Sequence, residues 1–304
     1  MIEVSHLSKK FGPLTAVDDL SFQVEPGRVT GFLGPNGAGK TTTLRIALDL
    51  VHATAGSVTF DGQRYSQLTK PQSHVAAALE ASSFHPGRTA LDHLKFLAPM
   101  VGVKDARCRE VLELVGLTDV ARKRVKGFSL GMRARLGLAA TMLGDPEVLL
   151  LDEPTNGLDP EGIAWMRGLL RHLAGQGHTI LVSSHLLSEV QQTVDDVVII
   201  AHGRLVHASS LDDLAKLSEA RTLVIPADPA AFARLAEQFQ WRLQLLPPLP
   251  DGGPAPGVHV LGVTAPEIGH ACFTGGIELR QLATQAEGLE AAFLALTEGQ
   301  GSMR

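Results

Sequence analysis

The chain has 304 residues and a mass of 32.3 kDa, which is enough for one large domain and a smaller one, each with its own core. Hydrophobic residues make up 44% and charged residues 19%, as in ordinary globular proteins, and the net charge of -5 argues against general nucleic-acid binding. The cysteines, Cys108 and Cys272, lie far apart without zinc-type or disulfide-type spacing, which favours a reducing compartment.

The first segment is predicted to form half-buried antiparallel strands, because Ile2 and Val4, and later Phe22 and Val24, alternate with polar residues. Phe11 falls between these strands. Two interpretations of its ring stay open: it is a core residue at a strand end, or it stacks on an adenine ring. Its place ahead of a glycine-rich loop is the argument for stacking.

That loop follows an apolar strand, and it matches the phosphate-loop pattern G-x-x-x-x-G-K-[ST] at every fixed position. Its residues are Gly34, Pro35, Asn36, Gly37, Ala38, Gly39, Lys40 and Thr41. Thr42 stands in the first turn of the helix that follows, where free backbone N–H groups attract phosphate. The glycines keep the loop open to phosphate, Lys40 adds a charge near the terminal phosphates, and Thr41 offers a hydroxyl to Mg²⁺. A plain structural turn is the alternative, and the order strand, loop, helix argues against it.

From Val75 onward the sequence pattern becomes typical of helices, and we expect a helical region over residues 80 to 145. The clearest helices are predicted at Ala90 to Met100 and at Asp105 to Val115, each followed closely by glycine. A third helix opens after Phe128, with Ser129 as its N-cap. On the residues alone, Ser129 could be a capping residue and nothing more.

Four aliphatic residues, Val148 to Leu151, predict a strand buried on both faces in a parallel sheet. The carboxylates of Asp152 and Glu153 at its end are costly unless a cation or a reaction uses them. We expect Asp152 to face Mg²⁺ beside Thr41 and Glu153 to accept a proton from the attacking water. The alternative is a helix N-terminus with its acidic residues on the dipole.

A second buried strand, Thr179 to Val182, leads to His185. A lone histidine after a strand is most often structural. This one lies at the carboxyl end of a parallel strand, where open α/β sheets bind their ligands. His185 is therefore a candidate site residue.

Taken in order, these motifs resemble the ATP-binding subunit of ABC transporters over residues 1 to about 215. The resemblance implies an α/β P-loop NTPase core of the ABC type, with an antiparallel subdomain and a helical subdomain. It makes Lys40, Glu153 and His185 the catalytic residues, with His185 sensing the γ-phosphate. It also implies a head-to-tail homodimer, in which Ser129 and Gly131 of one copy contact ATP bound to the other copy, while Phe11 stacks on adenine.

Two departures from the family pattern stand out. The usual LSGGQ signature is replaced by residues 128–132, FSLGM, and Glu80 stands where the family has a glutamine. Both spellings resemble the branch that includes daunorubicin and bacitracin resistance ATPases and other ABC-2 type systems. Glu80 can still ligate Mg²⁺, but a carboxylate cannot donate a hydrogen bond as an amide does.

Residues 216–304 are predicted to form a small α+β accessory domain. Strands alternate with helices in the order βαββαβ, followed by a last helix at 288–297, which indicates a ferredoxin-like sandwich. No catalytic cluster occurs in it. Support of the dimer or regulation is the expected role, ahead of a small-molecule sensor.

The sequence therefore predicts an ATPase subunit that binds ATP and Mg²⁺ and powers export through a separate membrane-spanning permease. No run of about twenty apolar residues occurs, so membrane association is expected through that partner, at the cytoplasmic face of a bacterial membrane. No nucleic-acid partner is expected. The alternatives are a soluble ABC ATPase acting on DNA or ribosomes, and a regulator that binds ATP without turnover.

Overall fold

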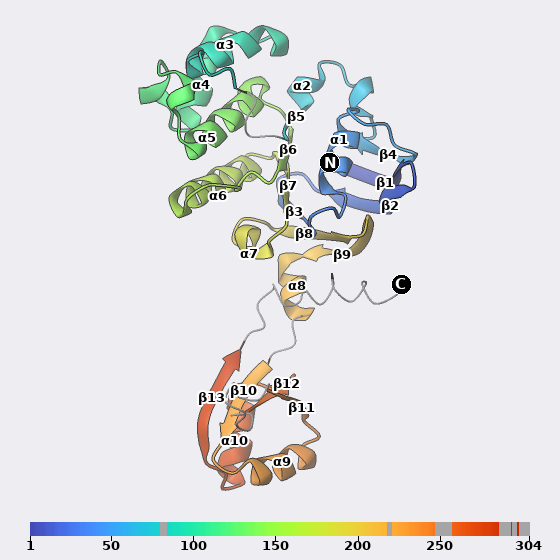
Figure 1. Ribbon diagram of the computed structural model, residues 1–304, viewed down its shortest axis with the longest axis vertical. Helices are drawn as coiled ribbons and strands as arrows, with labels where there is room; N and C mark the ends of the chain where they lie inside the picture. Colours follow the sequence, from blue (N-terminus) through green and yellow to red (C-terminus); the bar gives the residue numbers. More distant parts are fainter. Residues whose placement is uncertain (80–83, 218–220, 247–256, 286–292, 294–296, 298–304) are drawn as a thin grey trace. The chain divides into compact units, whose positions relative to one another are not determined.

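The computed structural model describes residues 1–79, 84–217, 221–246, 257–285, 293 and 297. The chain divides into two compact units, built chiefly from Met1–Leu211 and Asp212–Ala295 (Figure 1). This division lies a few residues before the expected domain boundary at residue 215. Within the described residues, no helix is both long enough and apolar enough to cross a bilayer.

The first unit is organised around a six-stranded sheet in the order β5-β6-β7-β3-β8-β9, in which only the β8–β9 pair is antiparallel. Its strands are β3 (Val29–Leu33), β5 (Val75–Ala78), β6 (Val148–Asp152), β7 (Thr179–Ser184), β8 (Asp196–Ala201) and β9 (Arg204–Ser210). Every residue of β3 and β7 is buried, as expected for parallel strands covered on both faces.

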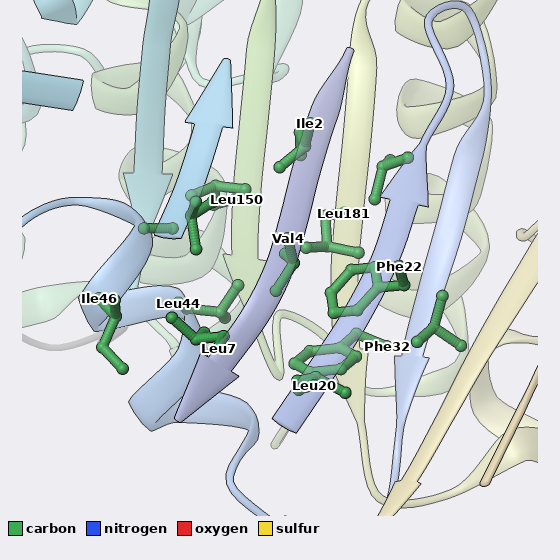
Figure 2. Packing of buried hydrophobic residues seen from close by; sticks show 14 of the residues in the cluster. Ile2, Val4, Leu7, Leu20, Phe22, Phe32, Leu44, Ile46, Leu150 and Leu181 are labelled. Carbon is green, nitrogen blue, oxygen red and sulfur yellow. The ribbon is translucent and has the colours of Figure 1, made fainter. Parts of the chain in front are cut away.

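A smaller antiparallel sheet, in the order β2-β1-β4, packs beside it. Its strands are β1 (Ile2–Phe11), β2 (Leu14–Val24) and β4 (Ala55–Phe60). Apolar side chains of both sheets form one core, in which the Phe22 and Phe32 rings lie 5.2 Å apart (Figure 2). Each fully buried large side chain stabilises this core by about 1.5–3 kcal/mol.

The helices of the first unit are α1 (Lys40–Ala47), α2 (Pro71–His74), α3 (Ala90–Val101), α4 (Asp105–Leu114), α5 (Leu130–Thr141), α6 (Pro160–Gly175) and α7 (Leu187–Val190). The next helix, α8 (Leu211–Leu217), begins at the last residue before the second unit. The antiparallel and helical subdomains are confirmed, because α3, α4 and α5 pack together within residues 80–145 (Figure 1). The expectation of helices from Val75 onward is wrong at its start, because residues 75–78 form β5 and pair in parallel with β6.

The second unit is a ferredoxin-like sandwich, as predicted. Its elements are β10 (Arg221–Pro226), α9 (Pro229–Gln238), β11 (Arg242–Leu245), β12 (Val258–Leu261), α10 (Ala265–Thr274) and β13 (Leu279–Gln285). The strands form an antiparallel sheet in the order β11-β12-β10-β13. Phe232, Val224, Val260 and Ile268 form its core. The last helix expected at residues 288–297 lies almost wholly outside the described residues.

Candidate nucleotide site

Three adjacent parallel strands, β6, β7 and β3, end at one edge of the sheet. The phosphate-loop sequence follows β3, Glu153 follows β6, and His185 follows β7. Gly34 N–H donates to Ser184 O at 3.3 Å, and Asp152 pairs in register with Ser183. Parallel strands bring their carboxyl ends together, so segments separated by more than a hundred residues share one site.

The glycines of the loop serve its packing as well as its openness. A Cβ on Gly34 would lie 2.4 Å from the backbone oxygen of Ile200, and one on Gly39 would lie 2.5 Å from that of Ala16. Gly37 has open space around it and a φ of +81°, which disfavours other residues. Thus Gly34 and Gly39 are required by close backbone contacts within the protein, while the exposed tip is free to receive a ligand.

Lys40 is 6% exposed and places its ammonium inside the loop. Its Nζ donates to Gly34 O at 2.6 Å and to Pro35 O at 3.3 Å, and it lies 3.7 Å from Glu153 Oε1. Burial lowers the pKa of Lys40, and the charges of Glu153 and Asp152 oppose that shift. The backbone carbonyls of the loop and the nearby carboxylate of Glu153 together surround the buried ammonium of Lys40.

Thr41 and Asp152 meet as the sequence predicts, with the threonine hydroxyl donating to Asp152 Oδ2 at 2.7 Å. The Ser183 hydroxyl donates to the other oxygen, Asp152 Oδ1. A hydroxyl and a carboxylate are oxygen ligands of the kind that Mg²⁺ takes together with phosphate and water. Across the described residues, no group of three or more acidic, histidine or cysteine side chains could hold a metal. The contact between Thr41 and Asp152 fits an Mg²⁺ that completes its shell with phosphate oxygens and water.

Glu153 is held on several sides. His185 Nδ1 lies 2.9 Å from its Oε2, and Asn156 Nδ2 donates to the same oxygen at 2.6 Å. Its backbone N–H donates to Ser183 Oγ at 2.9 Å. Glu153 has a φ of +47°, an uncommon conformation for a residue with a side chain. The surrounding contacts therefore fix both the backbone and the carboxylate at this position.

The segment after β7 is anchored by Glu189. Ser184 Oγ donates to Leu186 O at 3.0 Å and lies 3.2 Å from Glu189 Oε2, which also accepts from Thr155 Oγ1 at 3.3 Å. These contacts tie the loop that carries His185 to the segment that follows Glu153. The position of His185 beside the carboxylate is thus supported by a second layer of hydrogen bonds.

Ser129 and Gly131 lie at the start of α5. Figure 1 shows helix α5 apart from helix α1. Ser129 caps the helix by accepting from Met132 N–H at 3.2 Å. Leu130 lies so close to Gly157 that a Cβ there would be 2.2 Å from Leu130 Cδ2. Within one chain, the signature segment therefore contacts the turn after β6 rather than the phosphate loop.

Three further predicted residues complete the comparison with the sequence. Phe11 ends β1, is 48% exposed, and has Lys9 Nζ 4.7 Å from its ring centroid, so it is not a core residue. Thr42 is half-buried in the first turn of α1. Glu80 lies outside the described residues.

Two residues in this site have no role in the sequence-based prediction, Ser183 and Asn156. Ser183 contacts both Asp152 and the backbone of Glu153, and Asn156 contacts the Glu153 side chain. The parallel pairing of β6 with β7 was a usable signal for Ser183, because it places the residue level with Asp152. Asn156 reaches Glu153 only through the local turn, in which Asn156 N–H donates to Glu153 O at 3.1 Å.

The phosphate loop is also joined to the antiparallel sheet. Gly203 N–H donates to Ala38 O at 3.1 Å, and Asp18 N–H donates to Gly203 O at 2.9 Å. Arg204 adds an ion pair to Asp18 at 2.7 Å. The turn between β8 and β9 thus connects β2 to the loop.

An apolar cleft of about 520 Å³ lies between the segment that follows α1, strand β5 and the helices α3 and α5. Leu50 and Met100, which are 65% and 69% exposed, stand among its lining residues. Large apolar side chains at an exposed cleft are a typical feature of interaction surfaces. This cleft is separate from the carboxylates of the nucleotide site.

A phosphate loop at the carboxyl edge of a parallel sheet, with a carboxylate bonded to the threonine that follows the lysine, defines a P-loop nucleotide-binding protein. The sequence profile described as "ABC transporter" matches residues 17–156. The chain belongs to this family, and it is an ATP-binding and ATP-hydrolysing subunit of an ABC transporter.

Individual relatives support the same conclusion. The chain is 43% identical over 219 residues to the bacitracin transport ATP-binding protein BcrA of Bacillus licheniformis, covering 71% of this chain and 72% of the relative. It is 35% identical over 301 residues to the uncharacterized ABC transporter ATP-binding protein YdbJ of Bacillus subtilis (strain 168), covering 98% and 95% of the two chains. A solved structure of an ATP-binding subunit of an ABC transporter aligns with a TM-score of 0.65 and 26% identity, over 71% of this chain and 92% of that one.

Proposed function

We propose that the protein powers export of a substrate through a separate membrane-spanning permease, and that two copies pair head to tail around two ATP molecules. The observation that carries the proposal is the convergence of Lys40, Thr41, Asp152, Glu153 and His185 at the ends of three adjacent strands. A relative named for bacitracin transport supports the assignment to a drug exporter.

In this proposal, the loop from Gly34 to Thr42 wraps the phosphates with its backbone N–H groups, and Lys40 faces the terminal phosphates. Glu153 accepts the proton of the attacking water, and His185 holds the γ-phosphate and the carboxylate in line. The contact between His185 Nδ1 and Glu153 Oε2 at 2.9 Å supports a shared task for the two residues. Asn156 keeps the carboxylate oriented by its hydrogen bond.

Thr41 and Asp152 would hold Mg²⁺, with Glu80 as a further candidate ligand. When bound, Mg²⁺ neutralises charge on the phosphate oxygens. The hydrogen bond from Thr41 to Asp152 supports this ligand pair, because it already brings a hydroxyl and a carboxylate to one point. Ser183 fixes the rotation of Asp152 by bonding its second oxygen.

The dimer completes the site in trans. Ser129 and Gly131 lie at the exposed start of α5, and they would contact the γ-phosphate of ATP bound to the second copy. Free N–H groups at a helix start attract phosphate, which supports this role despite the altered signature. Phe11 would stack on adenine, and its 48% exposure supports this role.

The permease would dock a short amphipathic segment in the apolar cleft beside β5, where Leu50 and Met100 are exposed. This cleft adjoins the helical region, so a movement of α3 to α5 upon ATP binding would reach the membrane partner. The protein would then be a peripheral protein on the cytoplasmic face of a bacterial membrane. Neither a soluble ABC ATPase nor a regulator without turnover gains support from the named relatives, whose names specify transport.

Glu153→Gln tests the central assignment. We expect this variant to bind ATP, to lose turnover by about 10²-fold or more because the proton acceptor is gone, and to accumulate as an ATP-bound dimer. Steady-state ATPase rates and size-exclusion chromatography with ATP measure both effects.

The matched control is Glu161→Gln, which changes an exposed carboxylate in the first turn of α6 and should leave turnover unchanged. Adding Lys40→Ala to Glu153→Gln should abolish both ATP binding and the dimer. Turnover at the parent rate in Glu153→Gln would remove Glu153 from its role.

A further inference from the structure

The second unit contains a cleft of about 620 Å³ that takes no part in the nucleotide site. It lies between the end of α9, the loop that follows β12, and α10. Its lining includes Phe239, Trp241, Glu267 and His270. The cleft brings two aromatic rings and a carboxylate to one open cavity. None of these residues is used in ATP binding or hydrolysis as derived above.

The two rings form a stacked pair. Phe239 and Trp241 have ring centroids 5.3 Å apart and an interplanar angle of 24°. Phe239 is 49% exposed, so the pair presents aromatic surface to the cleft. An exposed aromatic pair lining a cavity offers both apolar contact area and an electron-rich ring face.

The local backbone holds this pair in place. Gln240, which separates Phe239 from Trp241 in the sequence, has a φ of +55°. At the end of α9, Trp241 N–H donates to Ala236 O at 2.9 Å. Trp241 also contacts Phe232 of the core, at a centroid distance of 6.1 Å. One end of the pair is therefore anchored in the core while the other is accessible.

The charge of the cleft is negative. Glu267 accepts hydrogen bonds from Thr264 N–H at 3.0 Å and from the Thr264 hydroxyl at 2.8 Å, and these bonds lower the pKa of Glu267. Its carboxylate is thus ionised at neutral pH. No lysine or arginine occurs among the described residues that line the cleft. Arg242 stands near its rim, with a guanidinium nitrogen 3.9 Å from the position of a Cβ on Gly262.

We propose that this cleft binds an organic cation with an apolar or aromatic body, which rests on the Phe239–Trp241 pair and turns its charge toward Glu267. The ring faces attract a cation, and the carboxylate adds a charge of opposite sign. An anion of the same shape loses both contributions and meets the repulsion of Glu267. The chain thereby carries a second ligand site, independent of its ATPase site.

The test uses the full chain and Trp241 as its reporter. The sequence has two tryptophans, so Trp165→Phe leaves Trp241 as the single tryptophan, which is excited selectively at wavelengths that Tyr65 does not absorb. Tetraphenylphosphonium and tetraphenylborate have the same shape and opposite charge, and each is titrated while tryptophan fluorescence is followed. We expect a saturable change with the cation and binding at least about tenfold weaker with the anion.

Two variants in the same background locate the charge. Glu267→Gln keeps an acceptor for Thr264, so the start of α10 is retained, and it should weaken cation binding about fivefold. Arg242→Gln removes a cation from the rim and should strengthen cation binding. Thermal unfolding confirms that each variant is folded. The proposal is overturned if neither ion alters the fluorescence, if both ions bind equally, or if Glu267→Gln titrates like its parent.

Discussion

At the scale of single residues, Ser183 connects the two carboxylates of the nucleotide site. Its hydroxyl donates to Asp152 and accepts from the backbone N–H of Glu153. Removing the Ser183 hydroxyl leaves the half-buried carboxylate of Asp152 and the backbone N–H of Glu153 each without one hydrogen-bond partner. Losing such hydrogen bonds costs about 1–3 kcal/mol, depending on the charge of the partner.

We therefore expect Ser183→Ala to lower the turnover number of the ATPase about tenfold. ATP binding should change less, because the phosphate loop does not contact this hydroxyl in the described structure. Steady-state ATPase rates and equilibrium ATP titrations separate the two effects. Ser188→Ala, an exposed position on α7, serves as the control. An unchanged turnover number in Ser183→Ala would contradict the positioning role.

The main contacts of the nucleotide site could be predicted from the sequence, but the hydrogen bonds that hold its catalytic carboxylate in place could not. Lys40, Thr41 and Asp152 could be placed together because each lies at the start or the end of a strongly patterned element, and parallel strands bring these ends to one edge. Asn156 could not be placed, because its contact with Glu153 depends on the dihedral angles of one turn. Pattern alone does not specify such angles.

At the scale of elements, the phosphate loop is packed against β8 as well as open to its ligand. The matched pair Gly34→Ala and Gly37→Ala separates these features. In Gly34→Ala, the Cβ meets the Ile200 backbone oxygen at 2.4 Å, and the chain must shift, at a cost of about 1–3 kcal/mol. In Gly37→Ala the added Cβ has no atom within 4 Å, so the only cost is that alanine disfavours the positive φ, by about 1 kcal/mol.

Urea unfolding of both variants measures the difference, and we expect Gly34→Ala to lose more stability and more ATP affinity. Equal destabilisation by the two substitutions would show that the contact with β8 does not restrain the loop.

One strand of the central sheet could not be predicted locally. Residues 75–78, VAAA, are rich in alanine, which favours helices, and the run is shorter than most strands. These residues form β5 because they pair with β6 across the sheet, from Val75 beside Val148 to Ala78 beside Leu151. The tertiary pairing overrides the local preference. The second unit was easier, since the order of its elements already indicates a ferredoxin-like sandwich.

At the scale of the whole molecule, the apolar cleft beside β5 links the ATPase to its membrane partner in our proposal. Leu50→Asp combined with Met100→Asp places two charges on the exposed lining of this cleft. We expect the variant to keep the ATPase rate of the isolated protein and to lose its association with membranes of the native host, because charges oppose docking of an apolar segment.

The fraction of protein that sediments with those membranes is the measurement. Leu205→Asp, on β9 and 38% exposed, is the control for a charge placed at an apolar surface residue elsewhere. A membrane-bound fraction that stays at the parent level in the double variant would rule out docking at the cleft.

The hydrogen bonds through Gly203 have a mechanical consequence. Because β2, the turn after β8 and the phosphate loop are hydrogen-bonded in series, from Asp18 to Gly203 to Ala38, we expect the antiparallel sheet and the loop to move together as one rigid unit. In our proposal, a nucleotide with its base on the antiparallel sheet and its phosphates in the loop would contact this unit at both ends without changing its shape. In our proposal, the motion that drives transport would therefore occur between this unit and the helical region of the same chain, and at the interface with the second copy.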